Sequence, residues 1–178
     1  MSTGDFDLTG DELREVARFA LSFADDVLPE FERVRPDDDR PRNAIAAARL
    51  FVDGEARSKL QRVTSLESHR AVKDTDVPAA QCAAQAAGDA ASAAYLHPIA
   101  KATQVGHILR SAANAVRITE LKASDPVSAV EAALVEVEAR ATPLVLDVLD
   151  WYPEFTTTSK IRTTQIMADL DSRLRRTR

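Results

Sequence analysis

Three consecutive carboxylates precede two arginines in the segment PDDDRPR, residues 36–42. Clustered carboxylates can bind magnesium or calcium, because these cations prefer oxygen ligands. The glycine and the terminal glutamate of an EF-hand loop are missing at their required spacings, so we expect no metal site here. We expect one of Asp37, Asp38 and Asp39 to cap the helix that follows, because acidic groups suit a helix N-terminus, and the others to be solvated.

The helix that follows carries arginines on one stripe. Arg42, Ile45, Arg49 and Val52 are spaced by three, four and three positions, so both guanidinium groups flank an apolar face. Such arginines pack their stems along the edge of a core and need acidic or carbonyl partners there. We expect structural ion pairs for these two arginines and for Arg40, with contact to a ligand or partner as the alternative.

The chain has three histidines, His69, His97 and His107. None is four positions from another and none lies in an H-E-x-x-H pattern, so no zinc site is predicted. Each by itself is more typical of a structural role. His69 joins the candidates for ion pairing or partner contact, because SHRAVKD places polar groups on a helix expected to face inward. Ser68 points elsewhere on that helix, so the two cannot form a nucleophile–base pair.

No other pattern completes a catalytic or cofactor site. Glu131 and Glu138 could face each other between helices, but a ferritin-like di-metal site also needs Glu-x-x-His motifs, which the chain lacks. The single cysteine, Cys82, excludes an internal disulfide and a thiolate zinc cage, and we expect it to be a small buried side chain. We therefore expect no cofactor, no metal and no enzymatic activity; a metal- or ligand-dependent enzyme is the least favoured alternative.

Helical periodicity predicts an all-α single domain of about seven helices over residues 1–178, with 1–8 and 176–178 loose. Thr9 and Glu12 form a capping-box pattern, and Pro29 should end or kink the helix that begins there. No stretch alternates polar and apolar residues, so no sheet is expected. The later helices are expected near residues 40–53, 55–74, 77–96, 98–122, 126–151 with a kink or split near 142, and 159–175.

The apolar positions predict how these helices pack. The alanine-rich segment 77–96 should be central, because small side chains let helix axes approach closely. The stripe from Val127 to Trp151 has heptad-like spacing and should lie along a neighbouring helix. Inward-facing positions are expected at Ala56, Leu60, Val63 and Leu66 in the third helix, and at Ile166, Met167, Leu170 and Leu174 in the last.

The composition is that of an ordinary globular protein, with 45% hydrophobic and 29% charged residues. Residues 1–39 hold 12 acidic and 4 basic side chains (−8), and residues 40–178 hold 16 and 19 (+3), which gives the net −5. This balance does not favour nucleic-acid binding. The acidic segment suits a basic partner, although a solvated face is the simpler explanation. No apolar run is long enough for a membrane span and no signal peptide is recognisable, so a cytoplasmic location is expected.

The first two helices carry a family resemblance. A helix ends in Leu28, Phe31 and Glu32; the segment Asp39-Arg-Pro-Arg42 follows; then an alanine-rich helix contains Phe51 and stops at Gly54. This pattern resembles bacterial immunity proteins of the immunity protein five-like group, which belong to polymorphic toxin systems. The match is good over residues 11–55 and weaker over 56–110. Phe51 replaces the family's usual tryptophan, and Asp89 and Tyr95 stand where histidines are expected.

The resemblance implies an all-α protein that binds and neutralises a cognate protein toxin by covering its surface, without catalysis. If the toxin is basic, the segment Asp25–Asp39 is the first choice for the contact face, because opposite charge speeds association. The alternative is a helical structural or adaptor protein that self-associates, as a homodimer, through the Val127–Trp151 stripe.

Overall fold

The computed structural model describes residues 5–177, and within that range the chain forms eight α-helices and no β-strand. The all-α prediction is therefore confirmed. Their bounds are α1 Gly10–Glu32, α2 Arg40–Val52, α3 Lys59–Ala71, α4 Pro78–Ser92, α5 Val105–Lys122, α6 Pro126–Arg140, α7 Pro143–Asp150 and α8 Arg162–Arg176. Short 3₁₀ helices are η1 Val72–Asp74, η2 Ala93–Tyr95 and η3 Ala102–Gln104.

Helix α1 begins at the predicted capping box. The Thr9 hydroxyl oxygen accepts the Glu12 N–H at 3.2 Å, and the Glu12 carboxylate accepts the Thr9 N–H at 2.7 Å. The prediction that Pro29 ends or kinks this helix was wrong about its end, because α1 continues to Glu32. A proline removes only its own N–H from the helical ladder, while its carbonyl still accepts the Arg33 N–H at 3.1 Å.

Pro143 and Gly54 interrupt the helices at the positions predicted from the sequence. Pro143 splits the predicted sixth helix into α6 and α7, and Thr142 caps α7 by accepting the Val145 N–H at 3.3 Å. This split raises the count from seven helices to eight. Gly54 follows α2 with a φ of 112°, a conformation that residues with a Cβ rarely adopt.

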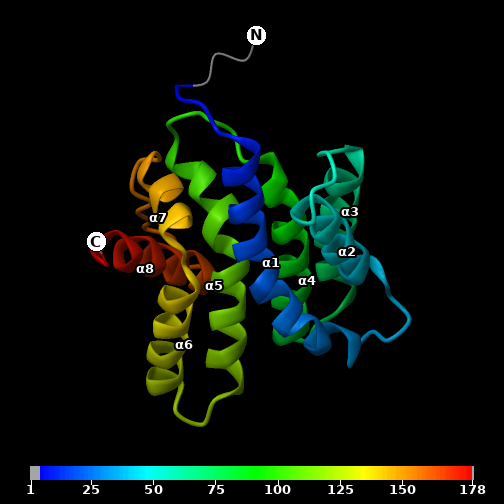
Figure 1. Ribbon diagram of the computed structural model, residues 1–178. Coiled ribbons are helices and arrows are strands. Elements are labelled where there is room, and N and C mark those ends of the chain that lie inside the picture. The colour runs from blue at the N-terminus through cyan, green and yellow to red at the C-terminus, as the bar shows by residue number, and fades with distance from the viewer. Residues whose placement is uncertain (1–4, 178) are drawn as a thin grey trace.

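Helix α4 occupies the centre, as predicted. It packs against α1, α2, α3 and α5, and α5 in turn packs against α1, α6 and α8 (Figure 1). The buried alanines of α4 make this possible, because they allow several helices to approach one axis. They are Ala80, Ala83, Ala84, Ala86, Ala87, Ala90 and Ala91.

Helix α3 faces the opposite way from the prediction. Leu60, Val63 and Leu66 are 45%, 41% and 51% exposed, and Ala56 is exposed before the helix begins. The buried positions are instead Gln61, Ser65, Ser68 and Ala71.

Two hydrogen bonds explain this orientation. The Gln61 side-chain amide donates to the Ala47 carbonyl at 3.0 Å, and the Ser68 hydroxyl donates to the Ala84 carbonyl at 2.7 Å. A buried polar group that is hydrogen-bonded costs little, and the small Ser68 side chain lets α3 lie close to the alanines of α4.

The C-terminal helices close the other side of the core. The expected inward positions of α8, Ile166, Met167, Leu170 and Leu174, are all buried. In the Val127–Trp151 stripe, Leu134, Val137 and Val148 are buried, whereas Val127 is 81% exposed. The middle of this stripe therefore belongs to the internal core, and only its ends reach the surface.

The first described residues contact the rest of the fold. The Asp5 N–H donates to the Pro98 carbonyl at 2.7 Å, and the Phe6 ring packs edge-on against Trp151 and Tyr152. This part of the segment expected to be loose is thus held in place, while residues 1–4 and 178 lie outside the described range. No helix within residues 5–177 has the length and apolar character needed to cross a membrane.

Candidate functional site

The three consecutive aspartates lie in the turn before α2 and have different surroundings. Asp39 occupies the N-cap position, but its side chain makes no capping hydrogen bond. The neighbouring Asp38 carboxylate accepts the Arg40 N–H at 3.2 Å and binds the Arg40 guanidinium through two further contacts at 2.8 and 2.5 Å. These hydrogen bonds lower the pKa of Asp38. Asp37 is exposed to solvent.

The three arginines Arg40, Arg42 and Arg49 of α2 connect it to neighbouring segments. Arg40 also binds the Asp74 carboxylate at 2.6 Å, which joins the turn before α2 to η1. Arg42 pairs with Glu32, and Arg49 pairs with Asp25 at 2.6 Å, so both link α2 to α1.

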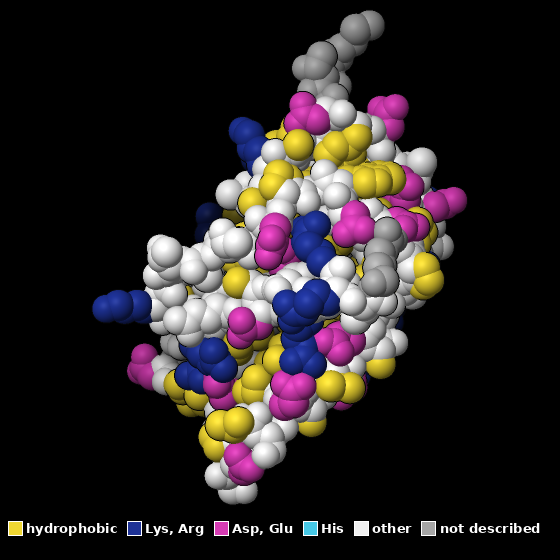
Figure 2. Space-filling view, turned by 90° about the vertical axis from the view of Figure 1, so that its left-hand side faces the viewer, with side chains coloured by type: hydrophobic (Ala, Val, Ile, Leu, Met, Phe, Trp, Pro, Cys, Tyr) yellow, Lys and Arg dark blue, Asp and Glu magenta, His cyan; other side chains and the backbone are white. Residues whose placement is uncertain are grey.

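Most of the N-terminal acidic groups have basic partners. Besides the pairs above, Asp26 binds Arg140 at 2.7 Å, and Glu30 binds Arg33 at 2.8 Å as well as Lys122. Neither Asp37 nor Asp39 has an ion-pair partner within residues 5–177. Basic and acidic side chains are also interspersed on the face drawn in Figure 2. The acidic excess of residues 1–39 is therefore largely neutralised by contacts to the rest of the chain.

A cleft between α3, α4 and α5 brings together side chains that the sequence did not relate. It has a volume of about 610 Å³, and its lining includes all three histidines of the chain, His69, His97 and His107. Arg62 and Arg110 also line it, as do Ser65, Leu66, Ser92 and Tyr95. The histidines come from three separate segments, so no fixed spacing in the sequence could have revealed this convergence.

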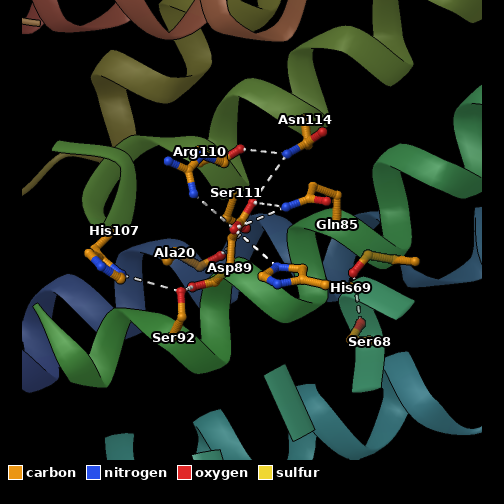
Figure 3. Close-up of polar contacts among 11 residues, drawn as sticks. Ala20, Ser68, His69, Gln85, Asp89, Ser92, His107, Arg110, Ser111 and Asn114 are labelled. Atoms are coloured by element: carbon orange, nitrogen blue, oxygen red, sulfur yellow. Dashed lines mark hydrogen bonds and ion pairs between the residues drawn. The ribbon is translucent and has the colours of Figure 1, made fainter. Parts of the chain in front are cut away.

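A buried carboxylate lies among these side chains. Asp89 on α4 is only 1% exposed, and Figure 3 shows four side chains directed at it. The Gln85 amide donates at 3.3 and 3.4 Å, Asn114 at 3.4 Å and Arg110 at 3.5 Å, while His69 Nε2 lies 3.2 Å from Oδ1. Each contact is long and therefore weak. The stabilisation of the buried negative charge is thus shared by four side chains.

The His69 imidazole lies close to the Asp89 carboxylate but is not oriented to form a hydrogen bond with it. His69 Nε2 is buried and lies within ion-pair range of the carboxylate, yet it forms no directed hydrogen bond. The imidazole reaches this place because residue 88 is glycine. A Cβ at Gly88 would overlap the ring of His69 and would lie 3.0 Å from the Ser65 carbonyl oxygen.

A second glycine makes room for the Arg110 side chain. A Cβ at Gly106 would overlap the guanidinium of Arg110, one turn further along α5. The Arg110 side chain is 42% exposed, so one part of it reaches Asp89 and another part reaches solvent. Gly88 and Gly106 thus each allow a nitrogen-bearing side chain to lie over a helix backbone.

His107 contacts Ser92 through its Nδ1 atom. The Ser92 hydroxyl donates to the Asp89 carbonyl at 2.9 Å, so the Ser92 oxygen is left to accept from His107 Nδ1 at 3.3 Å. With the Ser92 hydroxyl directed at the carbonyl, the matching tautomer of a neutral His107 has its proton on Nδ1 and its lone pair on Nε2. Burial of the ring lowers the pKa of His107, and the nearby Arg110 charge lowers it further.

Some polar side chains of the cleft already have partners within the chain, and others do not. The Ser68 hydroxyl donates to the Ala84 carbonyl, and the Ser92 hydroxyl donates to the Asp89 carbonyl while its oxygen also lies 3.3 Å from His107 Nδ1. No group of three or more His, Cys, Asp or Glu side chains among the described residues is arranged to hold a metal ion. The side chains of Arg62 and Ser65, in contrast, make no hydrogen bond or ion pair within residues 5–177, so their donors are free toward the cleft.

Residues 8–132 match a family model described as "Imm-5 like putative immunity protein". The matched region covers α1 to α5 and the first part of α6, and it includes every residue that lines the histidine cleft. No curated protein and no solved structure matches the chain.

Proposed function

The chain belongs to the Imm-5 like putative immunity protein family, and from this membership we propose that it binds and neutralises a cognate bacterial protein toxin. Neutralisation occurs by covering part of the toxin's surface, and the chain performs no chemistry on the toxin. Membership of a polymorphic toxin system and a cytoplasmic location are parts of the same proposal. The family match over residues 8–132 is the observation that carries it.

Two free carboxylates make the turn before α2 our first choice for the toxin contact. Asp37 and Asp39 are exposed and have no ion-pair partner within residues 5–177. Forming a contact with a basic toxin would break no ion pair that stabilises the fold, whereas recruiting Asp38 would compete with Arg40. This restricts the earlier choice of Asp25–Asp39 to the two carboxylates that remain available.

The proposal is tested by co-expressing the chain with toxins encoded near its gene and measuring growth. The expected result is rescue of growth, with the toxin recovered intact in a stable complex. Rescue accompanied by cleavage or modification of the toxin would contradict the absence of catalysis. Failure to rescue growth or to bind any of these toxins would remove the support for an immunity function.

The contact face is tested separately with matched charge variants. Changing both Asp37 and Asp39 to asparagine should weaken toxin binding and reduce its dependence on salt, because opposite charges steer association. The double change Asp7→Asn and Glu154→Gln is the matched control, since it removes two exposed acidic charges from other segments of the chain. Equal affinity for the first variant and wild type would exclude this face.

Self-association through the Val127–Trp151 stripe is less well supported. Leu134, Val137 and Val148 are occupied in the internal core, so a second copy could reach only the ends of the stripe. Light scattering on the purified chain decides this point, because the immunity proposal does not require a dimer.

A further inference from the structure

We propose that the histidine cleft binds an oxyanion, that is, a phosphate or carboxylate group. This group belongs either to a free organic molecule or to an acidic side chain of a bound protein. The cleft is defined by Arg62, His69, His97, His107 and Arg110, together with Ser65, Leu66, Ser92 and Tyr95. This activity is independent of the carboxylates assigned to toxin contact, which lie before α2.

The charge of the cleft favours an anion. Arg62 and Arg110 carry two positive charges, and no Asp or Glu among residues 5–177 lines the cleft. The negative charge that offsets them is the buried carboxylate of Asp89, which lies behind the cleft lining and already receives contacts from Gln85, Asn114 and Arg110. One positive charge therefore remains in excess before any histidine is protonated.

The free donors show where an oxyanion would be held. Arg62 has no partner within residues 5–177, although a guanidinium presents five N–H groups suited to planar or tetrahedral oxyanions. The Ser65 hydroxyl also lacks a partner in that range, and part of Arg110 remains exposed. An oxyanion would satisfy these groups without displacing any contact that holds the helices together.

The size and walls of the cleft indicate that the oxyanion is attached to a larger group. A cleft of about 610 Å³ is within the usual range for organic ligands and is far larger than one phosphate requires. Leu66 is 51% exposed beside it and supplies an apolar wall. The Tyr95 ring is fixed by its hydroxyl, which donates to the Ser58 carbonyl at 2.7 Å, and by the guanidinium of Arg57 over its face.

The three histidines provide a direct test, because they are the only ones in the chain. Inorganic phosphate is titrated into the untagged full chain at constant pH and ionic strength, and the three imidazole C–H signals are followed by NMR. Saturable shifts of these signals are expected. Signals that do not move, or that move equally with chloride, would overturn the proposal.

Matched variants on α3 locate the effect. Arg62→Gln should weaken phosphate binding about tenfold, the loss expected for one charge-assisted hydrogen bond, and Arg62→Lys should restore part of it. Arg70→Gln is the control: Arg70 is on the same helix, pairs with Glu67 and does not line the cleft. Because Arg62 has no partner in the described chain, its replacement should leave the melting temperature unchanged. Equal weakening by Arg62→Gln and Arg70→Gln would contradict the site.

A final measurement distinguishes the two sources of the oxyanion. If an acidic side chain of the toxin occupies the cleft, phosphate will compete with the toxin, and Arg62→Gln will weaken the complex. If a free molecule occupies it, phosphate will shift the histidine signals equally in the complex and in the isolated chain. Both outcomes support an oxyanion site, and failure of the immunity proposal would leave the titration of the isolated chain unaffected.

Discussion

Gly88 on α4 and His69 on α3 are so close that a methyl group at position 88 would overlap the imidazole ring. Glycine inside a helix is about 1 kcal/mol less favourable than alanine, because it leaves the unfolded chain with more freedom. In return, α3 approaches α4 closely, and His69 Nε2 lies 3.2 Å from the buried carboxylate of Asp89. The position of this histidine thus depends on an absent side chain on another helix.

Replacing Gly88 with alanine should destabilise the protein by about 1–3 kcal/mol, because overpacking at a helix contact outweighs the gain in helix propensity. The added methyl group would meet both the ring of His69 and the Ser65 carbonyl oxygen, which belongs to the backbone and cannot rotate away. Urea unfolding measures the loss, and the NMR signal of His69 should shift.

Gly106→Ala is the matched control for that change. The methyl group here would meet the guanidinium end of Arg110, a flexible group that can move aside. We expect stability within about 0.5 kcal/mol of wild type, or a gain of up to about 1 kcal/mol. A loss as large as that of Gly88→Ala would show that steric overlap at His69 is not the cause.

Changing Asp89 to asparagine should cost about 1–3 kcal/mol, because Arg110 and His69 would lose the buried charge that they surround. Asp37→Asn removes an equal charge from an exposed position and should change stability by less than about 0.5 kcal/mol. Urea unfolding of both variants provides the comparison. If the Asp89→Asn protein were as stable as wild type, the contacts of the Asp89 carboxylate would stabilise the fold no more than its desolvation destabilises it.

The lowered pKa of His107 predicts that acid weakens the fold. Between the folded pKa and the unfolded value of about 6.5, the unfolded chain binds a proton that the folded chain does not. Stability from this group is therefore complete above about pH 6.5 and is lost as the pH falls toward the folded pKa. The free energy of unfolding should decrease more in wild type than in His107→Gln over this interval. Parallel pH profiles for the two proteins would contradict the assignment.

Cys82 should react slowly with iodoacetamide while the protein is folded. Its side chain is partly buried, and burial raises the pKa of the thiol, so little reactive thiolate is present near neutral pH. Mass spectrometry should show much faster alkylation after unfolding in urea. Equal rates in the folded and unfolded states would show that the thiol is freely accessible.

The sequence by itself determined the helical class, the capping box at Thr9, the split at Pro143 and the buried face of α8. It also indicated the central place of the alanine-rich α4. These features depend on residues within one or two helical turns of each other, so spacing and residue type are sufficient to predict them.

Only the tertiary structure decided which face of α3 is buried and which side chains meet in the cleft. Apolar periodicity assigned Leu60 and Leu66 to the core, but close packing against α4 requires short side chains with hydrogen-bond partners, which Ser68 supplies. Likewise, packing between helices that are distant in the sequence brings His69 near Asp89 and places all three histidines around one cleft. Sequence spacing describes neighbours along one helix and contains no measure of contacts between helices.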